Sequence, residues 1–202
     1  MFINHPASLF ESLDDFVGIA VNGARGPAKL LGYLVSKRGV FGALKEAGRL
    51  AKMLKRPFSG FASEPFFTSA PIAMGPYAGR LRLKPTRSAV KQAGKVDWAT
   101  EFRSHLASGA VRYDVQVQLY TDDAATPIED ATVDWAESAS PYTTVATLNV
   151  HQETAGSTAL AERIEAASID LWQALAVHRP LGEINRARKV TYLHSQKARG
   201  AV

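Results

Sequence analysis

The chain has 202 residues, of which 46% are hydrophobic and 21% charged, and its formal net charge is +5 at pH 7. This is the composition of an ordinary globular domain, and it excludes a disordered or low-complexity chain. Cysteine is absent, so disulfides, thiolate metal sites and cysteine nucleophiles are excluded. The sequence has neither an apolar run long enough to span a membrane nor an N-terminal export signal, which predicts a cytoplasmic protein with one domain, 1–202.

Residues 1–56 form the first segment, and most of it is predicted to be helical. Its apolar side chains recur at helical spacing in two stripes, Leu9, Leu13, Phe16 and Val17 in one and Ala43, Leu44, Ala47, Leu50, Ala51 and Leu54 in the other. Cations at Lys45, Arg49, Lys52 and Lys55 accompany the second stripe. A basic amphipathic helix fits a membrane surface or an RNA backbone, but no aromatic wedge accompanies these cations, which favours an ordinary solvated face.

Residues 57–76 differ in composition from the helices before them. Prolines and glycines argue against a helix here, at Pro57, Gly60, Pro65, Pro71, Gly75 and Pro76. Four phenylalanines, Phe58, Phe61, Phe66 and Phe67, predict that this connector packs onto a core.

Residues 77–151 alternate between apolar and polar side chains, which indicates half-buried strands. The clearest case runs from Val111 to Leu119, and shorter ones cover 80–84, 131–135 and 146–150, so about four strands are predicted. Turn residues between the last three favour an antiparallel meander. A short helix is predicted over 98–106, between the first two strands.

Residues 152–202 return to a helical pattern and end in a basic helix over about 183–199. The order of helices, strands and helices predicts an α+β fold with an antiparallel sheet. One apolar face of such a sheet needs a covering layer. Either the chain's own helices cover it or a piece of the fold is missing.

Several common catalytic motifs are absent. There is no glycine-rich phosphate loop, no nucleophile elbow and no pair of histidines one helical turn apart. The five histidines are scattered along the sequence, so no metal site is predicted from them.

The last helix carries an arginine, a tyrosine and a second arginine on one face. Arg188 and Tyr192 stand four residues apart, and Arg199 follows two turns later. A tyrosine binds iron only as the phenolate, which a neighbouring arginine stabilises, and a second arginine suits a carboxylate. Spacing alone favours a surface helix that carries spaced cations over an iron-binding one.

The sequence before and within this helix resembles the catalase superfamily of heme proteins, and the resemblance covers most of the chain. The matching stretches are Pro127–Asp130, Trp135, Pro141, Val145–Leu148, Gln152, Trp172, His178–Gly182 and Ile184–Arg188. In that superfamily an arginine-x-x-x-tyrosine helix supplies the proximal heme ligand. The resemblance therefore implies heme as cofactor, Tyr192 as the iron ligand, Arg188 as its hydrogen-bonding partner and Arg199 as a propionate-binding residue.

The N-terminus adds to this resemblance and also departs from it. Phe2–Pro6 resembles the family's distal-asparagine segment, which implies that Asn4 positions peroxide, and Phe66–Pro71 resembles the passage into the second half of the barrel. The family's distal histidine precedes the asparagine and is not present. Ala7–Leu9 replaces the family's paired aromatics, and Asp170–Leu171 stands where the family has asparagine-proline. We therefore expect an incomplete, catalase-like barrel. Either the protein is truncated, or its start site has been assigned too far downstream.

The resemblance implies a heme-dependent oxidoreductase acting on hydrogen peroxide or an organic hydroperoxide, weak or inactive without the missing histidine segment. Its expected partners are the peroxide and either a separately encoded N-terminal half or further copies of the chain. The residues leave open a second hypothesis, a non-catalytic basic module that binds nucleic acid, a membrane surface or lipid. Nucleic acid and membrane are the less favoured partners.

Overall fold

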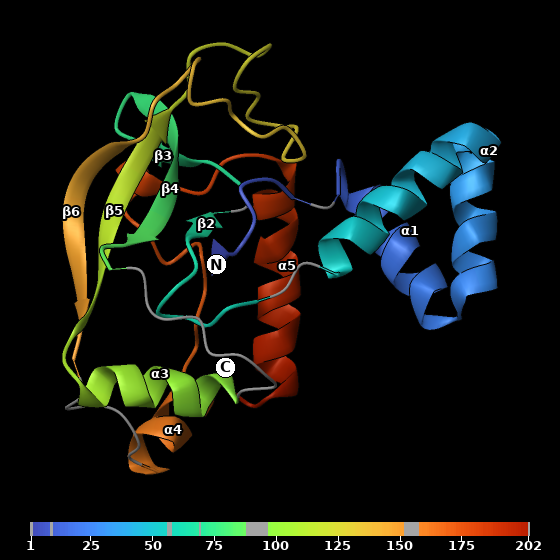
Figure 1. The fold of residues 1–202 in the computed structure, drawn as a ribbon. Coiled ribbons are helices and arrows are strands. Elements are labelled where there is room, and N and C mark those ends of the chain that lie inside the picture. The colour runs from blue at the N-terminus through green and yellow to red at the C-terminus, as the bar shows by residue number, and fades with distance from the viewer. Residues whose placement is uncertain are drawn as a thin grey trace.

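The computed structural model describes residues 2–8, 10–55, 58–68, 70–87, 97–151 and 158–201 (Figure 1). Four residues used in the sequence predictions, Leu9, Pro57, Ser69 and Gln152, lie outside this described part. The helices are α1 (Leu13–Ala24), α2 (Pro27–Leu54), α3 (Trp98–Ala107), α4 (Thr158–Glu165), the short 3₁₀ helix η2 (Ala176–His178) and α5 (Glu183–Ala198). The strands are β1 (Phe2–Ile3), β2 (Phe66–Thr68), β3 (Ile72–Met74), β4 (Tyr77–Pro85), β5 (Val111–Leu119) and β6 (Thr143–Val150). No helix in the described ranges is both long and apolar enough to cross a membrane.

The strands form one open antiparallel sheet in the order β1-β2-β4-β5-β6, with β3 also paired to β4. The long pair β4 and β5 is in register from Gly79 opposite Leu119 to Pro85 opposite Tyr113. A bulge at Val115 and Gln116 interrupts the pairing of β5 with β6. The α+β class and the open antiparallel sheet expected from the sequence are confirmed by this arrangement.

Three of the four predicted strands are confirmed as β4, β5 and β6, but the strand predicted over 131–135 is wrong. This stretch lies in a loop, where Trp135 is 1% exposed and donates from its indole to the carbonyl of Pro127 at 3.3 Å. Gln118 on β5 also donates its amide to the Trp135 carbonyl at 2.6 Å. Ala131 is buried too, so the alternation reflects a packed loop and not a strand. The three short strands β1, β2 and β3 lie in segments where no strand was predicted.

Helices α1 and α2 project to one side of the molecule, with α5 between them and the sheet (Figure 1). Gly39 has a φ of 68° and divides α2 into two helical segments, because only glycine adopts this left-handed conformation without strain. The two segments and α1 share a small core formed by Ile19, Leu34, Ala43 and Leu50. The helices predicted for this region are confirmed.

Contacts with Ile128 and Glu129 fix the start of α5. Gly182 precedes the helix with a φ of 83°, and a Cβ there would lie 2.8 Å from the carbonyl oxygen of Ile128. The carboxylate of Glu129 accepts a hydrogen bond from the Glu183 amide at 2.9 Å and forms an ion pair with Arg186 at 2.8 Å. A carboxylate here satisfies one of the free amides and complements the positive end of the helix dipole. The loop around 128–129 therefore sets where α5 begins.

Candidate functional site

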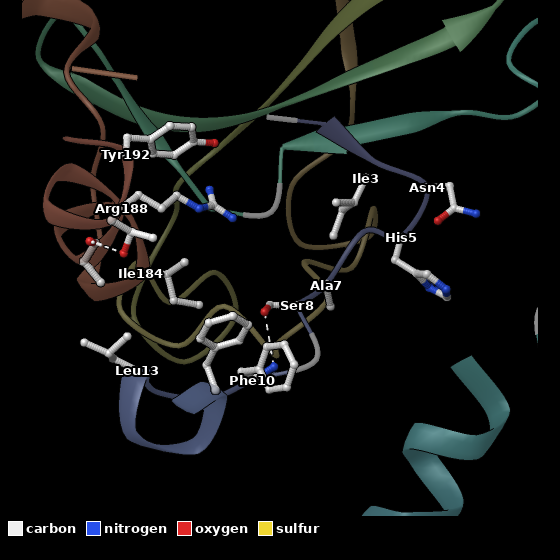
Figure 2. A pocket seen from close by; sticks show the side chains of 13 residues that line it. Ile3, Asn4, His5, Ala7, Ser8, Phe10, Leu13, Ile184, Arg188 and Tyr192 are labelled. Atoms are coloured by element: carbon white, nitrogen blue, oxygen red, sulfur yellow. Dashed lines mark hydrogen bonds between the residues drawn. The ribbon is translucent and has the colours of Figure 1, made fainter. Parts of the chain in front are cut away.

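A pocket with a volume of about 480 Å³ lies between the N-terminal segment, the start of α1 and one face of α5 (Figure 2). This volume falls in the range of about 300–1,000 Å³ that is usual for ligand sites. The wall from the N-terminal segment and α1 consists of Ile3, Asn4, His5, Ala7, Ser8, Phe10, Leu13 and Phe16, and the wall from α5 consists of Ile184, Ala187, Arg188, Thr191 and Tyr192. Seven of these thirteen side chains are apolar, and the other six carry polar groups that can orient a ligand.

Helix α5 brings Arg188 and Tyr192 to the pocket together, which confirms the expectation that they share a helix face. Figure 2 shows both side chains extending from the helix toward the N-terminal segment, with Ile3 opposite them. Tyr192 is half-buried, and its hydroxyl makes no hydrogen bond with any described residue. A phenol in this setting can donate to a bound molecule or, as phenolate, coordinate a metal.

Arg188 is held in place by Asn185, a residue that the sequence analysis did not single out. Its Nη1 donates to the Asn185 Oδ1 at 3.1 Å. Asn185 is 3% exposed, and its Nδ2 donates to the carbonyls of Leu181 at 2.8 Å and Pro71 at 3.1 Å. The spacing of three residues between Asn185 and Arg188 was the available signal, because such pairs meet on a helix surface.

The charge of Arg188 dominates the electrostatics of the pocket. It is the only permanently charged side chain among the described lining residues. Burial lowers the pKa of its guanidinium below the ordinary value, and the nearby Tyr192 acts in the opposite direction. A half-buried cation favours an anion bound in the pocket.

The opposite wall follows directly after β1. Ile3 pairs with Phe67 in the sheet, so the backbone of Asn4 is anchored at the end of a strand. The buried Ser8 closes this wall by donating its amide to the carbonyl of Ala131 at 2.7 Å. Asn4 and His5 both line the pocket, on the side away from α5 in Figure 2. Asn4 was a predicted site residue and His5 was not, because only the fold brings this segment opposite α5.

Arg199 does not line the pocket, unlike the other three predicted site residues. It caps the C-terminal end of α5, is exposed, and donates from Nη1 to the carbonyl of Glu165 at 2.9 Å. An α-helix rises about 1.5 Å per residue, so its Cα lies about 10 Å along the axis from Tyr192. Within the described ranges, no three His, Cys, Asp or Glu side chains gather as metal ligands.

Comparisons with known proteins identify the fold and leave the chemistry open. No protein-family model matches the sequence, and no curated protein matches it significantly. Among solved structures, a bacterial catalase superposes with a TM-score of 0.68 at 15% identity, over 97% of this chain and 42% of the catalase.

Two further catalases give the same result. A fungal catalase superposes with a TM-score of 0.73 at 14% identity over 98% of this chain and 44% of its own, and catalase A from Saccharomyces cerevisiae gives 0.72 at 12% over 98% and 45%. The chain therefore has a catalase-like fold and spans less than half the length of these catalases.

Proposed function

We propose, from the catalase-like fold of this chain, that it is a heme-binding oxidoreductase that acts on hydrogen peroxide or an organic hydroperoxide. The observation that carries the proposal is the meeting of Tyr192 and Arg188 from α5 with Asn4 from the N-terminal segment in one largely apolar pocket. Because fold alone does not imply function, these residues carry the proposal.

The residues of the pocket fit a heme group. Tyr192 has a hydroxyl without a hydrogen bond from the described residues, and a tyrosine is the axial ligand that catalases use for heme iron. Arg188 is half-buried one turn away on the same helix face, where its positive charge would favour a phenolate bound to iron. The apolar side chains of Phe10, Phe16 and Ile184 suit the faces of a large aromatic ring.

Bound heme would supply the redox chemistry, and the chain's own groups would bind and orient the peroxide. The Asn4 amide can donate one hydrogen bond to a peroxide oxygen and accept another, but it cannot exchange a proton at neutral pH. The imidazole of His5 is the titratable group on the same wall. We assign Asn4 the role of orienting the peroxide and keep His5 as the candidate for moving a proton.

The proposal also includes Arg199 as a binding group for a heme propionate. Its guanidinium is exposed and donates a hydrogen bond from one nitrogen to the Glu165 carbonyl. An arginine has five N–H donors in total, so others remain. A carboxylate could therefore bind the same side chain at this end of α5. Because Arg199 lies outside the pocket, its replacement by Gln should weaken heme binding less than loss of Tyr192.

Titration of the purified chain with heme tests the central claim. We expect a Soret band characteristic of tyrosinate ligation, and its loss in Tyr192→Phe. Tyr77→Phe is the matched control, since Tyr77 is exposed on β4, away from the pocket. A spectrum that Tyr192→Phe leaves unchanged would disprove ligation by this residue, and peroxide consumption by the loaded chain then tests the activity.

The exposed edge of the sheet supports a partner strand. Strand β6 lies at the end of the sheet, and its residues from Thr143 to Asn149 are all exposed. An unpaired edge is a template for another strand. We propose that a further polypeptide, either the other half of a barrel or a second copy, pairs there. Slower amide hydrogen exchange in β6 when the candidate partner is added would support this, and unchanged exchange would count against it.

A further inference from the structure

The second half of α2 carries an exposed apolar face that the pocket does not use. After the break at Gly39, Val40 is 59% exposed, Phe41 89% and Leu44 62%. Phe41 is the most exposed large apolar side chain of the described residues. Single exposed apolar residues are common, but three neighbours on one helix face form a patch that ordinarily contacts something.

The same segment has a clear inner face, so the exposed side chains are not the result of a poorly packed helix. Ala43 and Leu50 are buried in the core shared with α1, and Glu46 is also buried. Residues three and four apart share a helix face, so Ala43, Glu46 and Leu50 form the inner face, and Phe41, Leu44 and Lys45 lie together on the outer one. The segment is therefore amphipathic, and its outer face has no contact partner among the described elements.

The charges on this outer face all have one sign. Lys45, Lys52 and Lys55 are exposed beside the apolar patch. The single acidic residue between 40 and 55 is Glu46, which is buried and forms an ion pair with Arg49 at 2.6 Å. The exposed surface of the segment therefore combines apolar side chains with uncompensated positive charge.

We propose that this face, defined by Val40, Phe41, Leu44, Lys45 and Lys52, docks the protein on the surface of an anionic lipid bilayer. The apolar side chains would enter the boundary between headgroups and acyl chains, and the lysines would contact anionic headgroups. Phe41 supplies an exposed aromatic side chain beside these cations, so the expectation that no aromatic group accompanies them is wrong. The helix would lie on the membrane surface, and the proposal is independent of heme binding.

Charge complementarity favours an anionic bilayer over two other occupants. A second copy that docks through the same face would bring the lysines of both copies together, which is unfavourable for a symmetric interface. A nucleic acid would attract the lysines but would leave Val40 and Leu44 in water. Of these three occupants, the anionic lipid surface is the one that contacts both the apolar side chains and the lysines favourably.

Co-sedimentation of the full chain with lipid vesicles tests this proposal. The chain should bind vesicles of phosphatidylcholine with about one third phosphatidylserine and should not bind phosphatidylcholine alone, and salt should weaken binding. Phe41→Ser combined with Leu44→Ser should lower the partition coefficient about ten-fold or more for each side chain. Lys45→Glu combined with Lys52→Glu should lower it on the order of 25-fold or more.

Matched controls distinguish binding through this face from non-specific lipid binding and from the effects of unfolding. Leu175→Ser removes a side chain that is 69% exposed elsewhere, and Lys84→Glu reverses a charge on β4; neither should change binding. All variants alter exposed side chains, so their circular dichroism should match that of the wild type. Failure to bind anionic vesicles would overturn the proposal, as would binding that the α2 variants leave unchanged. The proposal would also be overturned if the wild type did not bind vesicles but self-associated or bound nucleic acid, and if the α2 variants lost that binding.

Discussion

Arg188 reaches into the pocket with its Nη1 held 3.1 Å from the Oδ1 of Asn185, one turn earlier on α5. Asn185 in turn donates to the carbonyls of Pro71 and Leu181, so the orientation of the arginine depends on the segment that follows β2. Asn185 is thus a positioning residue for Arg188 and at the same time joins α5 to the sheet.

Replacing Asn185 should cost stability and change the surroundings of Arg188. Asn185→Ala leaves the buried carbonyl of Pro71 and the partly buried carbonyl of Leu181 without this donor, and we expect a loss of about 2 kcal/mol in the free energy of unfolding. Urea denaturation measures this loss. Ser195→Ala, an exposed change on the same helix, is the control and should stay within about 0.5 kcal/mol of the wild type. A similarly small effect for Asn185→Ala would show that water replaces its hydrogen bonds.

Asn4 should affect peroxide turnover more than heme binding. In the heme-loaded chain, Asn4→Leu removes the groups that orient peroxide and should lower kcat/KM on the order of 100-fold, with the Soret band unchanged. Thr191→Val, which alters the opposite wall without changing its shape, should keep turnover close to the wild type. Equal losses in the two variants would assign the effect to general disturbance of the pocket.

The break in α2 provides a pair of glycine substitutions with opposite expected signs. Gly39→Ala forces a side chain into the left-handed region at a φ of 68° and should destabilise the chain by about 1 kcal/mol. Gly48→Ala lies within the regular helix, where an added Cβ meets no atom within 4 Å, and should stabilise it by about 0.5–1 kcal/mol. Thermal unfolding should therefore shift in opposite directions. A shift in the same direction for both would mean that Gly39 adopts another conformation in solution.

Tyr113 should make stability depend on pH in the alkaline range. Its hydroxyl donates to the carbonyl of Phe61 at 2.5 Å, and burial, followed by the nearby Glu101, raises its pKa from 10.0 to about 12. Since the folded form holds this proton more tightly, the stabilisation is complete below pH 10 and is lost between pH 10 and about 12. Tyr113→Phe should cost about 1 kcal/mol at neutral pH.

The measurement is the difference in unfolding free energy between wild type and Tyr113→Phe as the pH rises. This difference should narrow above pH 10, because the variant has no proton to lose. A difference that stays constant up to pH 12 would contradict the raised pKa.

Local patterns predicted the long elements correctly. The period-two alternation of Val111–Leu119 and the helical spacing in α5 each reflect contacts with one dominant face, which a sequence pattern can record. The stretch around Trp135 shows the limit of this reasoning. Its alternating burial arises in a loop held by the side chains of Gln118 and Trp135, and no local period distinguishes such a loop from a strand.

The site was predicted only in part, for a related reason. Arg188 and Tyr192 are neighbours on one helix, so their spacing was sufficient to pair them. Arg199 has compatible spacing, but it lies at the end of α5 and binds the Glu165 carbonyl. His5 faces the pocket only because the N-terminal segment crosses to α5, and such a long-range contact leaves no periodic signal in the sequence.

The two walls of the pocket come from opposite ends of the chain, residues 3–16 and 184–192. During synthesis the first wall leaves the ribosome well before the second, and contacts so distant in sequence form late in folding. The pocket therefore cannot hold a ligand until residues 184–192 have been synthesised. A molecule that it binds would then fasten the N-terminal segment to α5 and protect both from fraying.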